Sequence, residues 1–291
     1  MIDDKKFVLE FESRVKKTVL EYKLLSHTDS VVVACSGGKD STTVLYLLNK
    51  LGYNPAALLV DLEIGKWSDQ NLENLKHNTK IIGDIHIHIV SPRKVFGTSI
   101  CYLKDIARSK TDIGSCAICG VMKKWLLNKT ARELGATKVA TGHNMDDEVQ
   151  NLLLNILKGN PEMCTNLGPV TGVVRSRSLV DRIKPLHFVP EIDVRRYSEI
   201  LCRDSGFKFQ YDRCPCSVDG YRKEIRSVLN GLESKHRVKQ NMMENQDRLI
   251  KFLRSGSTGC GSIAVCESCG EPSRNSVCRL CEIMCEIGYS R

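Results

Sequence analysis

Paired cysteines give the first indication of chemistry in this sequence. Near its end the chain reads CESCGEPSRNSVCRLC, which contains two C-x-x-C pairs, Cys266 with Cys269 and Cys278 with Cys281. Two such pairs across a short loop supply the four thiolates that a tetrahedral zinc site needs. No coordination position stays open, so the sequence predicts a structural zinc ion that holds a tail too short to fold on its own core. The other two cysteines of the tail, Cys260 and Cys285, are expected to have no ligand role.

A third pair lies in GSCAICGVMKKW, where Cys116 and Cys119 stand at the start of a predicted helix. No second pair lies nearby to complete a zinc site. Among the remaining cysteines, Cys214 and Cys216 differ from the rest because they lie in a proline-containing turn, DRCPCSVDG, before another predicted helix. The chain has 14 cysteines, and in a reducing compartment so many are expected to be metal ligands or catalytic thiols rather than disulfides.

A glycine-rich loop, SGGKDS, joins the predicted strand VVVAC to the predicted helix STTVLYLLNKLG. Glycine lets the backbone turn tightly, and the amides at a helix N-terminus then point at an anion. The loop does not have the spacing of the common P-loop. The alternative is an ordinary glycine turn, but the strand, loop and helix lie where a phosphate site needs them. The residues expected to bind a nucleotide here are Ser36, Gly37, Gly38, Lys39, Asp40 and Ser41.

Two further loops are expected at the same edge of the sheet. Asp61 ends the second predicted strand, and TGHNMDDE, which contains Gly142, ends the fourth. Acidic residues beside a nucleotide commonly hold Mg²⁺. For Asp146 and Asp147 the alternative is capping of the following helix, since carboxylates are stabilised at a helix N-terminus, and both roles could coexist.

Strands alternate with helices along the chain, which predicts an α/β fold with a doubly wound parallel sheet. In such sheets ligands bind beyond the carboxyl ends of the strands. The expected strands are 31–35, 56–61, 85–90, 138–142 and 182–188. The expected helices are 41–52, a helix capped by Ser68 that runs to residue 83, a helix that starts near Cys116, and 147–159.

Three regions are expected. Residues 1–26 read as an amphipathic helix, residues 27–254 as the catalytic domain with a helical C-terminal part, and residues 255–291 as the cysteine-rich module. The stretch RSGSTGCGS has the composition of a linker between the last two.

Composition excludes a membrane protein and indicates a globular one. Hydrophobic residues make up 42% of the 291 residues and charged residues 26%. The sequence has no apolar run of membrane-spanning length and no signal peptide, so we expect a cytoplasmic protein. The net charge of +9 is either that of a merely basic protein or an indication of a polyanionic partner.

The motifs together resemble a known family. SGGKDS resembles the PP-loop of ATP pyrophosphatases. The order SGGKDS, CAICGVMKKWL, ATGHNMDDEVQN, CPCSVDGYRKEIRSVLNGLE and the four-cysteine tail resembles the TtuA, NcsA and TtcA group of tRNA thiolation enzymes. The resemblance implies a [4Fe–4S] cluster held by Cys116, Cys119 and Cys214, with one iron open, although Cys216 could replace Cys214. It also implies that Lys123 and Asp147 face the substrate base or ATP; a solvated helix lysine is the alternative for Lys123.

The resemblance implies an enzyme that adenylates the C2 oxygen of a tRNA uridine with ATP and Mg²⁺ and replaces it with sulfur. The sulfur donor would be sulfide or a thiocarboxylated ubiquitin-like carrier, and the chain could act as a homodimer. The basic segments 173–182 and 221–240 would then contact the tRNA backbone, or they are solvated faces. TtuA and NcsA proteins usually begin with a zinc finger, which this chain lacks, so thiolation of cytidine stays open. So do a cluster-free enzyme that carries a persulfide, an amide- or lysidine-forming ligase, and an RNA-binding zinc protein.

Overall fold

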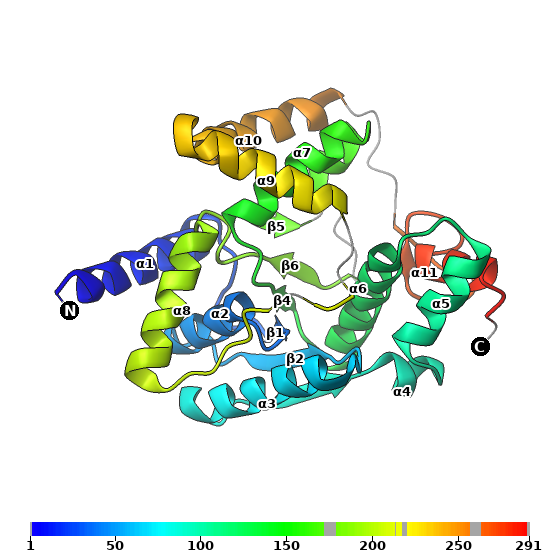
Figure 1. Cartoon of the computed structure of the whole chain (residues 1–291), viewed down its shortest axis with the longest axis horizontal. Helices are drawn as coiled ribbons and strands as arrows, with labels where there is room; N and C mark the ends of the chain where they lie inside the picture. Colours follow the sequence, from blue (N-terminus) through cyan, green and yellow to red (C-terminus); the bar gives the residue numbers. More distant parts are fainter. Residues whose placement is uncertain (1, 172–178, 213, 217–219, 257–262, 290–291) are drawn as a thin grey trace.

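The central element of the fold is a six-stranded sheet in the order β3-β2-β1-β4-β6-β5 (Figure 1). The computed structural model describes residues 2–171, 179–212, 214–216, 220–256 and 263–289. All neighbouring strands run parallel except β5, which pairs antiparallel with β6. The strands are β1 (Val31–Cys35), β2 (Ala56–Val60), β3 (Ile87–Val90), β4 (Lys138–Ala140), β5 (Val170–Thr171) and β6 (Asp181–Ile183). The prediction of a doubly wound parallel sheet is confirmed.

Strand order places a switch point between β1 and β4. From β1 the chain moves outward through β2 to β3, and then returns to form β4 on the other side of β1. Crossover connections diverge at such a point and leave a crevice beyond the carboxyl ends of the two strands. SGGKDS follows β1 and TGHNMDDE follows β4, so both loops lie where the topology opens this crevice.

Helices cover both faces of the sheet, because successive strand residues point to opposite sides. Val31 and Val33 of β1 lie in one core, and Val32 lies in the other. The first core is covered by α1 (Ile2–Glu21), α2 (Lys39–Lys50), α3 (Gly65–Ile82) and α8 (Glu191–Ser205). The second is covered by α4 (Pro92–Phe96), α5 (Ile100–Lys110) and α6 (Ser115–Glu133).

Two further groups of elements lie beyond this sandwich. A helical lobe stands beyond the β5 edge of the sheet (top of Figure 1) and has small cores of its own. It is formed by α7 (Met145–Leu157), η1 (Pro161–Asn166), α9 (Gly220–His236) and α10 (Val238–Gly256). The cysteine-rich tail packs against α6 and is formed by β7 (Ala264–Val265), β8 (Pro272–Ser273) and α11 (Arg279–Glu286). No helix in the described ranges is both long and apolar enough to cross a bilayer.

Some expected boundaries were wrong. The strand expected over 182–188 ends at Ile183, and the chain then turns, with the His187 N–H donating to the Lys184 carbonyl at 3.0 Å. Ser68 does not cap α3, which begins at Gly65; its hydroxyl instead accepts a bond from the Ile64 N–H at 2.9 Å. Most of the linker, Cys260 and the basic stretch 173–178 lie outside the described residues.

Candidate active site

The loop SGGKDS folds as a phosphate site would require. Gly37 has a φ of +76°, and a Cβ there would lie 2.3 Å from the Asn71 carbonyl oxygen, so only glycine fits. The Ser36 N–H donates to Ser41 Oγ at 3.1 Å, which closes the loop over the start of α2. Gly38 is the N-cap of α2 and has no side chain to satisfy the first-turn amides. Those amides can therefore bind an anion, aided by the helix dipole.

Carboxylates surround Lys39 of this loop. Its Nζ lies 2.7 Å from Asp40 Oδ2 and 3.4 Å from Glu191 Oε1. The other oxygen of Asp40 accepts a bond from Asn144 Nδ2 at 3.1 Å. Burial raises the pKa of Asp40, and Lys39 opposes that shift. Arg226 of α9 lies 3.2 Å from the second oxygen of Glu191, so the loop lysine is linked through one carboxylate to the helical lobe.

The loop after β4 packs directly onto SGGKDS. A Cβ on Gly142 would lie 2.6 Å from the backbone nitrogen of Ser41, so the two loops touch backbone to backbone. At the start of α7, Asn144 and Asp147 form a capping box with bonds of 3.2 and 3.4 Å. Capping, the alternative weighed for Asp146 and Asp147, is therefore observed for Asp147. Asp146 accepts the Glu191 N–H at 2.8 Å and an ion pair from Lys239, so both of its oxygens are engaged.

Asp61 is the carboxylate that keeps an oxygen for a magnesium ion, because both oxygens of Asp40 are engaged by Lys39 and Asn144. Asp61 follows β2, which neighbours β1 in the sheet, and its Oδ1 accepts the Glu63 N–H at 2.8 Å, so its Oδ2 is left for a ligand among the described residues. Mg²⁺ beside a nucleotide takes one or two carboxylates and completes its shell with phosphate and water. Oxygen donors in this number fit such an ion.

The C-x-x-C pair lies in the first turn of α6, which begins at Ser115. A helix N-terminus stabilises thiolates. Burial raises the pKa of Cys119; Lys123 and Lys104 oppose that shift, and the charges of Cys214 and Cys116 add to it. Cys116 Sγ lies 3.8 Å from the Cys216 carbonyl oxygen. The structure thus brings the proline-containing turn against the pair.

One chain segment links these cysteines to the phosphate loop. Gln210 forms a β-bridge with Gly38, Trp67 Nε1 donates to the Asp212 carbonyl at 3.4 Å, and Cys216 reaches Cys116. Six residues of extended chain span at most about 20 Å. The C-x-x-C pair therefore lies within about 20 Å of SGGKDS, in reach of a nucleotide bound there. We call the region between them the cleft.

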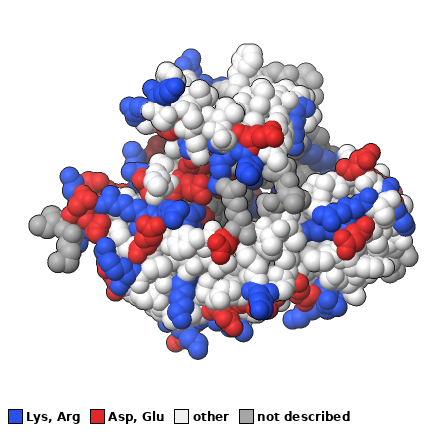
Figure 2. Space-filling model, viewed as in Figure 1, with Lys and Arg blue, Asp and Glu red and all other residues white. Residues whose placement is uncertain are grey.

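The structure places several cations beside the site residues, among them Arg182 and Arg222 of the two basic segments named from the sequence. The first turn of α9 places Arg222 against Asn151 of α7 and beside Asp147, whose pKa is raised by burial and lowered by Arg222. Desolvation by the surrounding protein and the cations Lys184, Arg222 and Arg182 lower the pKa of His143 to about 4. His143 is therefore neutral at pH 7. Figure 2 shows acidic and basic side chains side by side around the recess beneath α9 and α10.

The four tail cysteines form a separate group with the arrangement that a metal site needs. One ligand atom from each of Cys266, Cys269, Cys278 and Cys281 lies within 4.8 Å of the others, and within the described ranges this is the only such set of three or more. The Cys278 N–H donates to Cys266 Sγ at 3.2 Å. Burial acts to raise the pKa of Cys266, but backbone N–H groups, that of Ser268 included, outweigh it and lower the pKa to about 6. The donor set fits zinc.

Removing the tail metal is expected to destabilise the whole protein, because Leu280, Ile283 and Ile287 lie in the same core as α6. For Cys266→Ala, or for wild type treated with a chelator, we expect the thermal midpoint to fall by roughly 5–10 °C, as for a loss of about 3 kcal/mol. Differential scanning calorimetry with zinc analysis tests this. Cys285→Ala, at an exposed position, is the control and should behave as wild type. An unchanged midpoint in the chelated protein would show that no metal holds the tail.

Comparison with known proteins defines the class first. A family model described as a PP-loop domain matches residues 8–231. The chain therefore belongs to the PP-loop family.

Within that family the similarity extends over nearly the whole chain. The tRNA-5-methyluridine(54) 2-sulfurtransferase of Pyrococcus horikoshii is 33% identical over 273 residues, which cover 94% of this chain and 84% of that protein. The tRNA 2-thiolation protein NcsA of Haloferax volcanii is 29% identical over 300 residues, covering 97% and 91%. The solved structure of the U34-tRNA thiolase NcsA from Methanococcus maripaludis with its [4Fe-4S] cluster matches with a TM-score of 0.81, 27% identity and coverage of 98% and 89%. These matches confirm the resemblance to the tRNA 2-thiolation enzymes and the prediction of a sulfurtransferase.

Proposed function

We propose that this protein is an ATP-dependent enzyme that replaces the C2 oxygen of a tRNA uridine with sulfur in the cytoplasm. The observation that carries the proposal is the segment 210–216, which ties SGGKDS to the cysteines at Cys116. A site for activating an oxygen and a site for supplying sulfur thus share one cleft. Relatives named as tRNA 2-sulfurtransferases support the same reading.

The residues present suit an iron–sulfur cluster better than a single metal ion. Cys116 and Cys214 lie close enough to Cys119 to affect its pKa. Among the described residues, however, these three thiols are not as closely spaced as the tail cysteines, whose ligand atoms all lie within 4.8 Å of one another. Thiolates that bind different irons of one cluster must stand further apart than ligands of one zinc ion. We assign Cys214 as the third ligand, because Cys216 turns its carbonyl group toward Cys116. When bound, such a cluster supplies thiolate-held iron with one position free for sulfide.

The substrate chemistry then needs two displacements. The C2 oxygen of the base attacks the α-phosphorus of ATP and pyrophosphate leaves. Hydrosulfide, supplied as sulfide or released when water hydrolyses a carrier thiocarboxylate to its carboxylate, adds to C2, and AMP leaves with the oxygen. SGGKDS holds the phosphates, while Asp61 holds Mg²⁺ together with phosphate oxygens. The exposed Lys123, one turn beyond Cys119, neutralises negative charge that develops on the base or the phosphate. Asp147 accepts a proton from the base.

The proposed role of Asp147 predicts a pH dependence. Burial raises the pKa of Asp147 and Glu191 adds to it, while Arg222 and Arg226 lower it. A carboxylate that accepts a proton must be ionised, so activity falls as the pH drops through its pKa. Arg222→Gln removes the nearer cation, so the acid limb of the kcat/KM profile should move to higher pH, by roughly one unit. Lys223→Gln, at an exposed position on α9, should leave the limb in place; a limb unchanged in Arg222→Gln would remove Asp147 from this role.

Anaerobic purification tests the cluster. The proposal expects brown protein that absorbs near 400 nm and contains about four irons per chain. Colourless protein with full thiolation activity would instead favour a persulfide on Cys116 or Cys119, and activity without any sulfur source would favour a ligase.

A further inference from the structure

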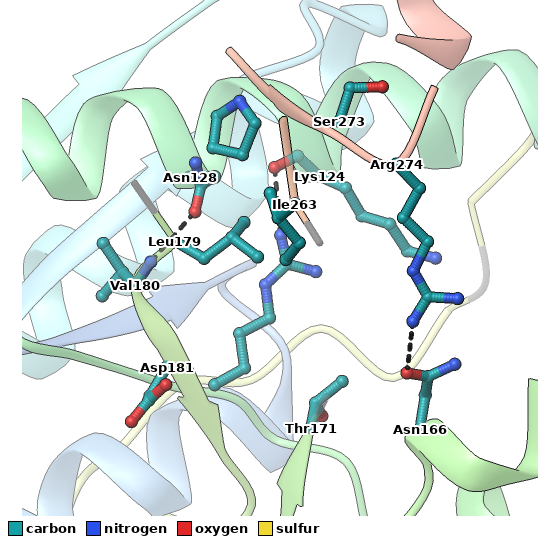
Figure 3. Close-up of a pocket in the computed structure, with 12 residues that line it drawn as sticks. Lys124, Asn128, Asn166, Thr171, Leu179, Val180, Asp181, Ile263, Ser273 and Arg274 are labelled. Atoms are coloured by element: carbon teal, nitrogen blue, oxygen red, sulfur yellow. Dashed lines mark hydrogen bonds between the residues drawn. The ribbon is translucent and has the colours of Figure 1, made fainter. Parts of the chain in front are cut away.

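A second polar pocket lies away from the cleft, between α6, β6 and the cysteine-rich tail. It has a volume of about 260 Å³. Lys124 of α6, Arg182 of β6 and Arg274, which follows β8, contribute to its lining. Figure 3 shows the side chains of Lys124 and Arg274 extending into the same space. Three elements that are distant in the sequence therefore bring three cations together.

The cations of this pocket lack acidic partners, whereas the nearby carboxylates already have theirs. Among the described residues, Lys124, Arg182 and Arg274 take part in no ion pair. Asp181, on the pocket wall, is paired with Lys138 at 2.7 Å. Glu271, next to Pro272 of the wall, is buried and paired with Arg132. The pocket thus holds uncompensated positive charge, and burial together with Arg182 lowers the pKa of Lys124.

Hydrogen bonds hold the two guanidinium groups in place without exhausting them. Arg274 Nη2 donates to Asn166 Oδ1 at 3.1 Å (Figure 3). Arg182 Nη2 donates to the Lys124 carbonyl at 3.0 Å. Each guanidinium has five N–H donors, so several remain for a ligand. A rigid array of charged donors is suited to an oxyanion with several acceptor oxygens, above all a phosphate.

Positive charge continues from this pocket into the candidate active site. Arg182 lines the pocket. Together with Lys184 and Arg222 it also lowers the pKa of His143, which follows β4. Lys124 is likewise under the influence of Arg182, Arg222 and Lys184. A polyanion whose base enters the cleft could therefore lay its backbone along one continuous basic path. A free phosphate would need no such path.

We propose that the pocket of Lys124, Arg182 and Arg274 binds a backbone phosphate of the RNA, so that the cysteine-rich tail forms one wall of the RNA-binding surface. The inference rests on the proposed function for the identity of the polyanion. It gives the tail a part in substrate binding beyond its structural metal.

Binding of an unmodified tRNA transcript, measured by fluorescence anisotropy without ATP or a sulfur source, tests this pocket. For Arg274→Gln we expect the Kd to rise roughly tenfold at low salt, and the slope of log Kd against log salt concentration to fall by about one. Arg274→Lys keeps the positive charge but loses the guanidinium group that donates to Asn166. It should keep the wild-type slope of log Kd against log salt concentration. Arg279→Gln is the matched control, since Arg279 of the tail is already paired with Glu282 and Glu286 at 3.1 and 3.2 Å, and it should bind as wild type.

Two results would overturn the inference. One is an Arg274→Gln variant with a lowered thermal midpoint and an unchanged salt slope, which would leave Arg274 a purely structural contact. The other is an Arg274→Gln variant that no longer binds inorganic phosphate, as measured by calorimetry, but binds RNA with unchanged affinity. That result would make the pocket a site for a free oxyanion. Neither assay involves turnover, so failure of the thiolation reaction would not alter their results. If the protein thiolates tRNA but Arg274→Gln leaves the salt dependence of the Kd unchanged, only this inference is contradicted.

Discussion

Alanine in place of Cys116, Cys119 or Cys214 is expected to abolish sulfur transfer while ATP binding survives. The three thiols lie together at the start of α6, and loss of one ligand leaves too few thiolates to retain a cluster. SGGKDS leads from β1 into α2, and no hydrogen bond among the described residues joins it to the three cysteines. We expect thiolation to fall by on the order of a hundredfold or more, beyond the 10–100-fold cost typical of losing a mere supporting contact to a metal ligand.

Cys216→Ala is the matched control for this series. It lies two residues from Cys214 in the same turn, and its observed contact with Cys116 is made by a backbone carbonyl that alanine keeps. We expect normal iron content and activity. Iron per chain and 2-thiouridine formed per ATP consumed are the quantities to measure. If Cys216→Ala loses iron while Cys214→Ala keeps it, the assignment of the third ligand is reversed.

Gly142→Ala is expected to weaken ATP binding strongly. A Cβ at this position would lie 2.6 Å from the Ser41 nitrogen and 2.8 Å from the Asp40 carbonyl carbon. Both are backbone atoms, so no side-chain rotation relieves the clash, and the start of α2 must move. Displacing a binding group by about 1 Å can cost about a hundredfold, and we expect the Kd for ATP to rise by that order.

Gly231→Ala controls for the chemistry of the substitution. Gly231 lies inside α9, has no positive φ, and a Cβ added there would have nothing within 4 Å. Alanine at this position should be neutral or slightly stabilising, since it favours a helix. Isothermal titration calorimetry with a non-hydrolysable ATP analogue measures both variants. Wild-type affinity in Gly142→Ala would show that the contact between the two loops does not shape the nucleotide site.

The sequence predicted the parts of the fold that depend on local patterns. Apolar runs such as VVVAC indicated the strands, and the glycines of SGGKDS indicated the turn, because both signals lie within a few residues. Spacing also predicted the compact tail site, since four cysteines in two pairs leave few other arrangements. The prediction of a strand from residue 182 to 188 was wrong beyond Ile183. The residues of the turn that follows are buried, so their hydrophobic pattern looks like that of a buried strand.

The partners of the site residues could not be predicted, because they come from distant parts of the chain. Glu191 reaches Lys39 across 152 positions, and Asn144 reaches Asp40 across 104. The sequence groups Arg222 with the other basic residues of its helix as a candidate for RNA contact, but the structure places it beside Asp147. Each contact depends on how α7, α8 and α9 pack around the cleft, and only the three-dimensional structure defines that packing.

Mass spectrometry of tRNA nucleosides from a strain that lacks this gene tests the central claim most directly. The account predicts that one 2-thiolated uridine disappears, that the wild-type gene restores it, and that the gene for Cys116→Ala does not. An unchanged set of thiolated nucleosides would contradict the assignment as a tRNA thiolase, and loss of 2-thiocytidine in place of a thiouridine would contradict the assigned base.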